Sequence, residues 1–388
     1  MSENNFVGVV GSGAMGSGIA QVAATAGENV LLFDSNKESL RKTAGSFQTN
    51  LNKLEEKGKL KQGEASAIFS RIKFAESINE YSKCNLVIEA IIEDLPVKHK
   101  VFSELETIVD GKCILASNTS SLSIASIASS CKITSRVIGI HFFNPAHVMP
   151  LVEIIPAITT SNDITQSAKA RIDSWKKVTV IAKDTPGFIV NRVARSYYGE
   201  SIRIYEEGIA DFVTIDWAMK EFGGFKMGPF ELMDFIGNDI NYKVTESVWE
   251  QFFYEPRFKP SLTQKRLYEA KLFGRKTGKG YYDYAEGSIP PQPKKDEQLG
   301  KQIFERVLAM LINEAIDSNY LKLASRDDLD MAMTKGVNYP KGLLKWADDI
   351  GLDNVLNTLQ SLYDWYAEDR YRPCVLLKSM VKEGRKFY

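Results

Sequence analysis

The feature that most constrains the fold is a glycine-rich turn near the N-terminus, which joins an apolar run to a helical stretch. The run FVGVV at 6–10 leads into GSGAMG at 11–16, and residues 17–26 have helical character. In the spacing G-x-G-x-x-G, Gly11 permits the tight turn, Gly13 admits a pyrophosphate, and Gly16 lets helix and strand pack closely. The pattern predicts a strand–turn–helix unit that binds a dinucleotide through its helix N-terminus, with Ala14 and Met15 also in the loop that binds it.

A second apolar run indicates which dinucleotide binds. NVLLF at 29–33 ends at Asp34, 23 positions after Gly11. A carboxylate there accepts hydrogen bonds from the adenosine ribose and repels a 2′-phosphate, so NAD is expected in preference to NADP. FAD-binding chains begin with the same loop, but we find no FAD-specific contacts in the rest of the sequence.

Further apolar runs follow through the first half of the chain, at 85–90, 113–117, 136–142, 151–155 and 177–181. Most are continuous rather than alternating, which is typical of parallel strands that helices cover on both faces. Residues 1–184 are therefore predicted to form an α/β Rossmann-type NAD-binding domain.

The second half of the chain is predicted to be helical and internally repeated. Pro186 is well placed to open a long helix. Residues 287–298, rich in proline and charge, are typical of a linker. A shift of 114 residues lays 192–239 on 306–353 without a gap, with about a quarter of the positions identical. We expect two repeated all-α domains, at 185–290 and 297–388.

Composition argues against several classes of partner. Lysine plus arginine equals aspartate plus glutamate at 49 each, which disfavours a nucleic-acid binder or a polybasic membrane protein. No apolar run approaches the roughly 18 residues of a membrane span, and the N-terminus does not resemble a signal peptide. The four cysteines lack CxxC spacing and local histidines, so we expect reduced thiols in a cytoplasmic protein and no metal site.

One histidine stands where catalytic residues are expected. His141 ends an apolar run, and the carboxyl ends of strands in such sheets face the ligand crevice. Glu153 lies inside the next apolar run, where a carboxylate is out of place unless it is paired. A histidine paired with a carboxylate is a positioned general base. The other two histidines have weaker cases: His99 is expected on an exposed helix, and nothing in the sequence pairs with His147.

Several segments together resemble the 3-hydroxyacyl-CoA dehydrogenase family, including its short-chain 3-hydroxybutyryl-CoA members. Besides the glycine-rich loop, they are SNTSSL at 117–122, HFFNP at 141–145, PLVEIIP at 150–156, PGFIVNR at 186–192 and GRKTGKGYY at 274–282. The resemblance covers residues 6 to 284. The repeated tail resembles the duplicated C-terminal domain of some members.

The resemblance implies a reaction and a set of site residues. The reaction is NAD-dependent oxidation of a (3S)-3-hydroxyacyl-CoA, as in β-oxidation of fatty acids. His141 would be the general base and Glu153 its partner, with Ser120 and Asn191 placing the substrate oxygens. The implied NAD contacts beyond the loop and Asp34 are Glu93, Lys98, Ser120, Asn144 and Lys276. Asn50 and Lys57 would contact coenzyme A, although the family usually has a serine at the first of these positions.

Other functions stay open from the sequence. Members with a duplicated tail include 3-hydroxyadipyl-CoA dehydrogenases of aromatic-acid breakdown, whose dicarboxylate substrate needs a basic residue in the acyl pocket. A free hydroxy-acid dehydrogenase of related architecture usually carries a lysine in place of the histidine–glutamate pair. A non-catalytic NAD-binding protein would lack His141 or Glu153, and both are present.

The repeat bears on assembly as well. Glu305 falls where the first copy has Asn191, so the second copy is expected to be non-catalytic. The single helical domain of the shorter family members forms a homodimer. Here the second copy is expected either to occupy the partner's place, as in a monomeric pseudo-dimer, or to add bulk to a homodimer.

Overall fold

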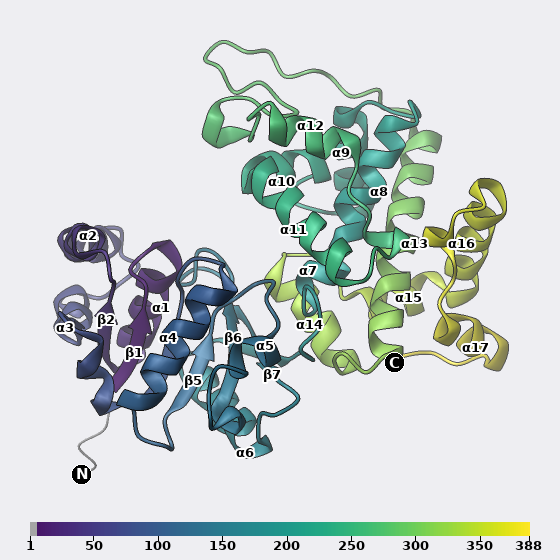
Figure 1. Ribbon diagram of the computed structural model, residues 1–388. Helices are drawn as coiled ribbons and strands as arrows, with labels where there is room; N and C mark the ends of the chain where they lie inside the picture. The colour runs from purple at the N-terminus through teal and green to yellow at the C-terminus, as the bar shows by residue number, and fades with distance from the viewer. Residues whose placement is uncertain (1–5) are drawn as a thin grey trace. The chain divides into compact units, whose positions relative to one another are not determined.

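The computed structural model describes residues 6–388, in which the chain divides into two compact units between Thr185 and Pro186 (Figure 1). The first unit is an α/β domain and the second is helical. None of the helices in the described part of the chain combines the length and the apolar character that a membrane span requires.

The first unit is built on one eight-stranded sheet in the order β3-β2-β1-β4-β5-β6-β7-β8. The strands are β1 (Phe6–Val10), β2 (Asn29–Phe33), β3 (Ile72–Phe74), β4 (Cys84–Glu89), β5 (Ile114–Ser117), β6 (Val137–Phe142), β7 (Leu151–Pro156) and β8 (Val178–Ile181). Every neighbouring pair is parallel except β6 and β7. The order 3-2-1-4-5-6 is that of a doubly wound dinucleotide-binding sheet, which confirms the predicted Rossmann-type fold.

Two features of the sheet differ from the prediction. β3 was not predicted, because three residues are too few to show a hydrophobic period. β7 runs antiparallel to β6, because the chain between Phe142 and Leu151 is too short for the crossover that a parallel neighbour needs.

Helices pack against this sheet. They are α1 (Ala14–Thr25), α2 (Lys37–Glu56), α3 (Glu64–Ser70), α4 (Leu95–Ile108), α5 (Ile124–Ala128) and α6 (Asn162–Ser174), with 3₁₀ turns η1 (Ile78–Lys83) and η2 (Thr134–Arg136). α1 begins three residues earlier than expected, directly on the glycine-rich loop. Its apolar side and that of α6 share a buried cluster with the strands, and this fixes the loop at the carboxyl edge of the sheet.

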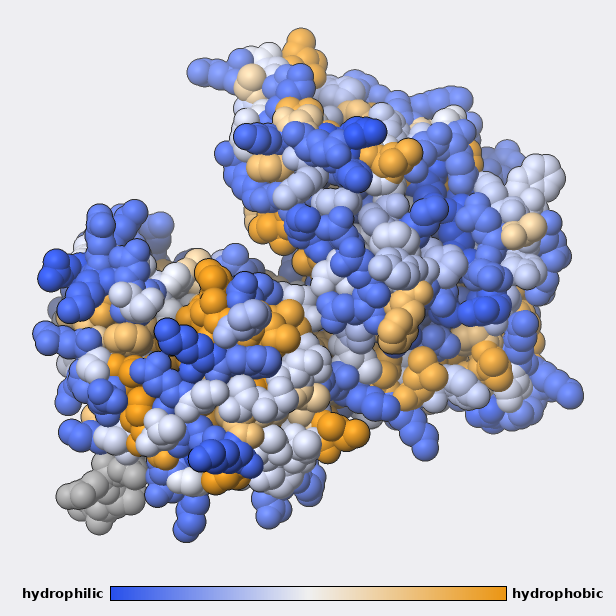
Figure 2. Space-filling view, viewed as in Figure 1, coloured by the Kyte–Doolittle hydropathy of each residue, from blue (hydrophilic) through white to orange (hydrophobic). Residues whose placement is uncertain are grey.

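The second unit contains two sets of helices. The first set, here called the first copy, is α7 (Val190–Val193), α8 (Arg195–Glu206), α9 (Phe212–Gly223), α10 (Pro229–Ile236), α11 (Asn238–Gln251) and α12 (Leu262–Glu269). The second copy is α13 (Glu297–Tyr320), α14 (Arg326–Gly336), α15 (Leu343–Ile350), α16 (Leu352–Tyr366) and α17 (Val375–Glu383). Short 3₁₀ turns are η3 (Pro256–Phe258), η4 (Arg275–Thr277) and η5 (Asp369–Tyr371). On the face drawn in Figure 2, apolar residues of this unit form scattered groups among hydrophilic ones.

The expectation that a long helix starts at Pro186 was wrong. Pro186 does not open a long helix, because Gly187 and Phe188 both have left-handed backbone, with φ of 74° and 46°. The first helix begins only at Val190 and lasts one turn. The predicted linker extends two residues too far, since α13 begins at Glu297 with Asp296 as its cap.

The sequence repeat is also a structural repeat. At the shift of 114 residues, α9 to α12 correspond to α14 to α17, and α13 corresponds to α7 and α8 together. Asp216 accepts two backbone N–H groups of the first turn of α10, at 2.8 and 2.9 Å. Asp330, its counterpart, accepts the same two N–H groups of α15 at the same distances. The two copies thus share their local chemistry as well as their helices.

The copies are joined by two buried ion pairs that are also related by the repeat. Arg192 Nε lies 2.5 Å from Glu314 Oε1, and Arg306 Nε lies 2.6 Å from Glu200 Oε1. Arg306 and Glu314 are the counterparts of Arg192 and Glu200, so each copy supplies the arginine to one pair and the glutamate to the other. This reciprocity is the mark of an isologous interface, here inside one chain.

Candidate active site

The glycine-rich loop has the geometry that a dinucleotide needs. Gly11 has φ of 103°, and its N–H donates to Phe33 O at 2.8 Å, which closes the turn against β2. A Cβ on Gly16 would lie 1.8 Å from Gly11 O, so α1 can approach the loop only through a glycine. A Cβ on Gly13 would meet nothing within 4 Å. The space beside Gly13 is therefore open to a ligand at the N-terminus of α1.

A cavity of about 650 Å³ lies beside this loop. Its walls are the loop itself, α1, α2 and the segment that follows β6, and its lining includes Lys42, Lys53, Asn144 and His147. Burial, Lys177 and Lys59 lower the pKa of His147. Two lysines at an open hollow next to a helix N-terminus fit a ligand that carries phosphates.

Of the two residues that the resemblance assigns to coenzyme A, only one lines this cavity. Asn50 lines it, whereas Lys57 is exposed at the C-cap of α2 and is not among its lining residues. Of the loop residues, Ala14 lines the cavity, and Met15 packs against the apolar core.

The Asp34 carboxylate faces the glycine-rich loop and also holds it in place. Its Oδ2 accepts both the backbone N–H and the hydroxyl of Ser12, each at 2.8 Å, and its Oδ1 accepts Asn36 N–H at 2.8 Å. Asp34 is half-exposed, and a carboxylate has about four lone-pair sites. It therefore keeps capacity for ribose hydroxyls while it fixes the turn.

His141 and Glu153 form a buried pair across the antiparallel strands β6 and β7. They face each other in register, with His141 Nδ1 2.7 Å from Glu153 Oε2. His141 is 5% exposed and Glu153 is 0% exposed. The carboxylate favours the tautomer with the proton on Nδ1, which leaves Nε2 as the proton acceptor. The predicted pair is thus present with the geometry of an oriented general base.

The loop after β5, which contains Ser120, is fixed by Glu93. Glu93 Oε1 accepts Ser120 N–H at 3.1 Å, Ser121 N–H at 3.2 Å and the Thr119 hydroxyl at 2.5 Å. Burial opposes ionisation of Glu93, but Lys98 and these hydrogen bonds outweigh it and lower the pKa of the carboxyl. Glu93 is therefore a charged anchor for the Ser120 loop.

Beneath Glu93 lies a buried ion pair that was not predicted. Lys98 is 1% exposed, and its Nζ lies 2.9 Å from both oxygens of Glu89 and 3.3 Å from Glu93 Oε2. The Ser117 hydroxyl also donates to Glu89. The signal was available, since Glu89 is a carboxylate inside an apolar run, like Glu153. In this arrangement Lys98 supports Glu93, and its implied contact with NAD stays a prediction.

The loop of Ser120 and the strand of His141 are joined directly. Asn118 Oδ1 accepts Phe142 N–H at 2.8 Å, and β5 and β6 are parallel neighbours. Both strands therefore end at the same edge of the sheet, the edge that binds ligands in folds of this kind. Asn118 was not singled out from the sequence, because its role depends on the register of the two strands.

The remaining predicted residues belong to the second unit. Asn191 lies in α7, half-exposed, and its carbonyl accepts Arg195 Nε at 2.7 Å. Lys276 lies in η4 and pairs with Asp239 at 2.5 Å. His99, expected to be exposed, is half-buried with Nε2 2.8 Å from Ser126 O, so it links α4 to α5. Within residues 6–388 no cluster of histidine, cysteine and carboxylate side chains is arranged to hold a metal ion.

Both units of the chain are similar to those of a known enzyme family. Residues 6–185 match the family model of the 3-hydroxyacyl-CoA dehydrogenase NAD binding domain, and residues 187–284 and 303–387 match the C-terminal domain of that family. The chain is 35% identical to 3-hydroxyadipyl-CoA dehydrogenase of Escherichia coli, over 96% of both chains. It is 38% identical to a probable 3-hydroxybutyryl-CoA dehydrogenase of Deinococcus radiodurans, over 71% of this chain and 99% of the other.

A solved structure extends the likeness to the whole fold. The crystal structure of 3-hydroxybutyryl-CoA dehydrogenase from Escherichia coli superposes with a TM-score of 0.92, at 33% identity and over 98% of both chains. The resemblance inferred from the motifs is therefore confirmed. The chain belongs to the 3-hydroxyacyl-CoA dehydrogenase family and is an NAD-dependent oxidoreductase.

Proposed function

We propose that the protein oxidises a short-chain (3S)-3-hydroxyacyl-CoA, such as 3-hydroxybutyryl-CoA, with His141 as its general base. The observation that carries the proposal is the buried pair of His141 and Glu153 at the sheet edge that also bears the glycine-rich loop. When bound, NAD supplies the hydride acceptor. His141 Nε2 takes the proton of the 3-hydroxyl group, and Glu153 stabilises the imidazolium that forms. In the reverse direction the imidazolium returns the proton.

The other site residues receive positioning and binding roles in this proposal. Ser120 and Asn191 hydrogen-bond the substrate oxygens, and Glu93 keeps the Ser120 loop in place. The residues proposed to hold NAD are Gly11, Gly13, Ala14, Met15, Gly16, Asp34, Glu93, Lys98, Ser120, Asn144 and Lys276. Asn50 and Lys57 on and after α2 are proposed to contact coenzyme A, and the lysines of the adjacent cavity add positive charge for its phosphates.

A different acyl group, that of 3-hydroxyadipyl-CoA, also has support. The Escherichia coli relative that matches this chain end to end, including the second copy, is named for 3-hydroxyadipyl-CoA. The Deinococcus relative named for 3-hydroxybutyryl-CoA spans 71% of this chain, whereas the Escherichia coli structure that covers 98% of it is also named for 3-hydroxybutyryl-CoA. A dicarboxylate substrate is therefore the alternative to a simple short chain.

A panel of 3-ketoacyl-CoA substrates tests the proposal. NADH oxidation is followed with acetoacetyl-CoA, with longer 3-ketoacyl-CoAs and with 3-oxoadipyl-CoA. The highest kcat/KM is expected with acetoacetyl-CoA. A preference for 3-oxoadipyl-CoA would establish the dicarboxylate alternative, and turnover with none of the thioesters would refute both.

His141→Gln is expected to bind NAD normally and to lose about 10² to 10⁴-fold in kcat, which is the contribution of general-base catalysis. Stopped-flow turnover measures kcat, and titration with NADH measures binding of the cofactor. The control is His99→Gln, which changes a histidine that links α4 to α5 and should leave kcat unaffected. A near-normal kcat for His141→Gln would remove this residue from the mechanism.

Replacing Asp34 is expected to narrow the preference for NAD over NADP, because the repulsion of a 2′-phosphate is lost. Two variants separate this effect from the role of Asp34 in the loop. Asp34→Asn keeps an oxygen for Ser12 N–H, whereas Asp34→Ala removes both side-chain oxygens that accept from Ser12 and Asn36. Both should shift the ratio of kcat/KM for the two cofactors, and Asp34→Ala should also melt at a lower temperature. An unchanged ratio in both variants would show that the ribose does not meet Asp34.

We further propose three domains, 1–184, 185–290 and 297–388, in a cytoplasmic protein, with the last domain a non-catalytic copy that replaces a partner subunit. Two observations support the replacement. The reciprocal ion pairs have the form of a two-fold interface, and the Deinococcus relative lacks the length of a second copy. Light scattering is expected to give the mass of one chain, 43.5 kDa. A mass of twice this value at micromolar concentration would favour the homodimer instead.

A further inference from the structure

The short helix that carries Asn191 is held in place by the second copy. α7 contacts both α13 and α14. Arg192, the residue after Asn191, points into α13, where its Nε lies 2.5 Å from Glu314 Oε1 and its terminal nitrogen lies 3.2 Å from Asp317 Oδ2. Asn191, which is assigned to substrate binding, is therefore adjacent in the chain to a residue that forms an ion pair with the second copy.

α7 is anchored by a helix at its C-terminal end only. Ala194, whose backbone is helical, is the single residue between α7 and α8. Its N-terminal side is not helical, since Gly187 and Phe188 are left-handed. On its C-terminal side Arg195 bonds the Asn191 carbonyl. The Arg192 guanidinium, which also lies over the Phe252 ring at 4.8 Å, supplies its charged contact with the second copy.

Burial restricts the geometry of the ion pair between Arg192 and Glu314. The side chains of Arg192 and Glu314 are 4% and 1% exposed. Arg257 completes the cluster, with its nitrogen 3.1 Å from Glu314 Oε2. A shift of the Arg192 guanidinium would leave a carboxylate buried with an incomplete set of donors, which is costly in the protein interior. The second copy thus fixes Arg192 in one place.

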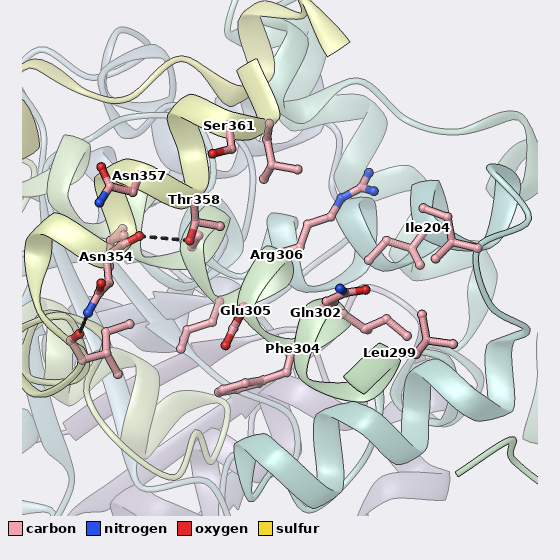
Figure 3. A pocket seen from close by; sticks show the side chains of 17 residues that line it. Ile204, Leu299, Gln302, Phe304, Glu305, Arg306, Asn354, Asn357, Thr358 and Ser361 are labelled. Atoms are coloured by element: carbon pink, nitrogen blue, oxygen red, sulfur yellow. Dashed lines mark hydrogen bonds between the residues drawn. The ribbon is translucent and has the colours of Figure 1, made fainter. Parts of the chain in front are cut away.

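The repeat contains a second ion pair of the same kind, next to a residue to which no catalytic role is assigned. Arg306 is held by Glu200 at 2.6 Å, and Glu200 accepts the Tyr371 hydroxyl as Glu314 accepts Arg257, again 114 residues apart. The residue before Arg306 is Glu305 instead of asparagine. Figure 3 shows Glu305 and Arg306 on α13 beside a cavity of about 850 Å³, whose lining includes residues of α16.

We propose that Glu314 and Asp317 of the second copy are positioning residues for Asn191 and act on it through Arg192. The second copy then contributes to turnover, although it carries no asparagine at the equivalent position. This inference rests on the proposed role of Asn191 in binding the substrate oxygens.

The test compares Glu314→Gln with Glu200→Gln in the full-length enzyme. Each substitution removes one charge from one of the two related ion pairs. Glu314→Gln is expected to lower kcat for acetoacetyl-CoA about 10 to 100-fold, because a small displacement of a positioning group is costly, with little change in KM for NADH. Glu200→Gln is expected to keep kcat within about twofold, since no substrate-binding residue adjoins Arg306. Thermal unfolding of both variants measures the loss of stability separately.

Equal losses of kcat in the two variants, or an unchanged kcat in Glu314→Gln, would overturn the inference. If either glutamine variant fails to fold, Arg192→Lys and Arg306→Lys replace the pair, because lysine keeps the charge and loses the forked geometry. The same asymmetry in kcat is expected from them, and its absence overturns the inference equally.

Asn191→Ala separates this inference from the proposed function. Its kcat should fall, and the double variant with Glu314→Gln should lose little more, because both changes act on one group. If Asn191→Ala lowers kcat and Glu314→Gln does not, the positioning role fails alone. If Asn191→Ala leaves kcat unchanged, the assigned role of Asn191 fails together with the inference.

Discussion

Buried carboxylates that must be compensated organise this molecule. Glu89, Glu153, Glu200 and Glu314 have almost no exposed surface. Removing an ionised carboxylate from water costs several kcal/mol unless cations or hydrogen-bond donors replace the water. Each glutamate therefore dictates where its partner lies. In the first unit this orients the imidazole of His141 and holds Lys98 beside Glu93, the carboxylate that anchors the loop of Ser120. In the second unit it joins the two copies.

The strands of the sheet could be predicted where the sequence carries long apolar runs. The structure could not be predicted where the length of a connection or the backbone conformation of a few residues determines it. Apart from β3, the strands of the first half were expected within one residue of their observed limits, because a strand buried on both faces needs a continuous run. The direction of β7 follows from the length of its connection, which apolar patterning does not register. At Pro186 the left-handed backbone of the next residues overrides the local preference for a helix start.

The site was predictable where chemistry and sequence position coincide. His141 and Glu153 stood out because one ends an apolar run and the other interrupts one, and the structure pairs them. Glu89 carried the same signal but lacked an obvious partner nearby, since Lys98 is on the following helix. Asn118 depends on strand register, and the ion pairs between the copies depend on packing, neither of which a sequence match reveals. The roles of Asn191 and Lys276 toward the substrate and NAD remain predictions.

The covalent link between the two helical copies changes how their interface responds to dilution. Between separate subunits, a two-fold interface is governed by mass action, and the assembled fraction falls as protein concentration falls. Here both faces belong to one polypeptide, so their association is intramolecular and the effective concentration is set by the connecting chain. The link also frees each face from being a replica of the other. Sequence changes can then accumulate on one side alone, as the exchange of asparagine for Glu305 illustrates.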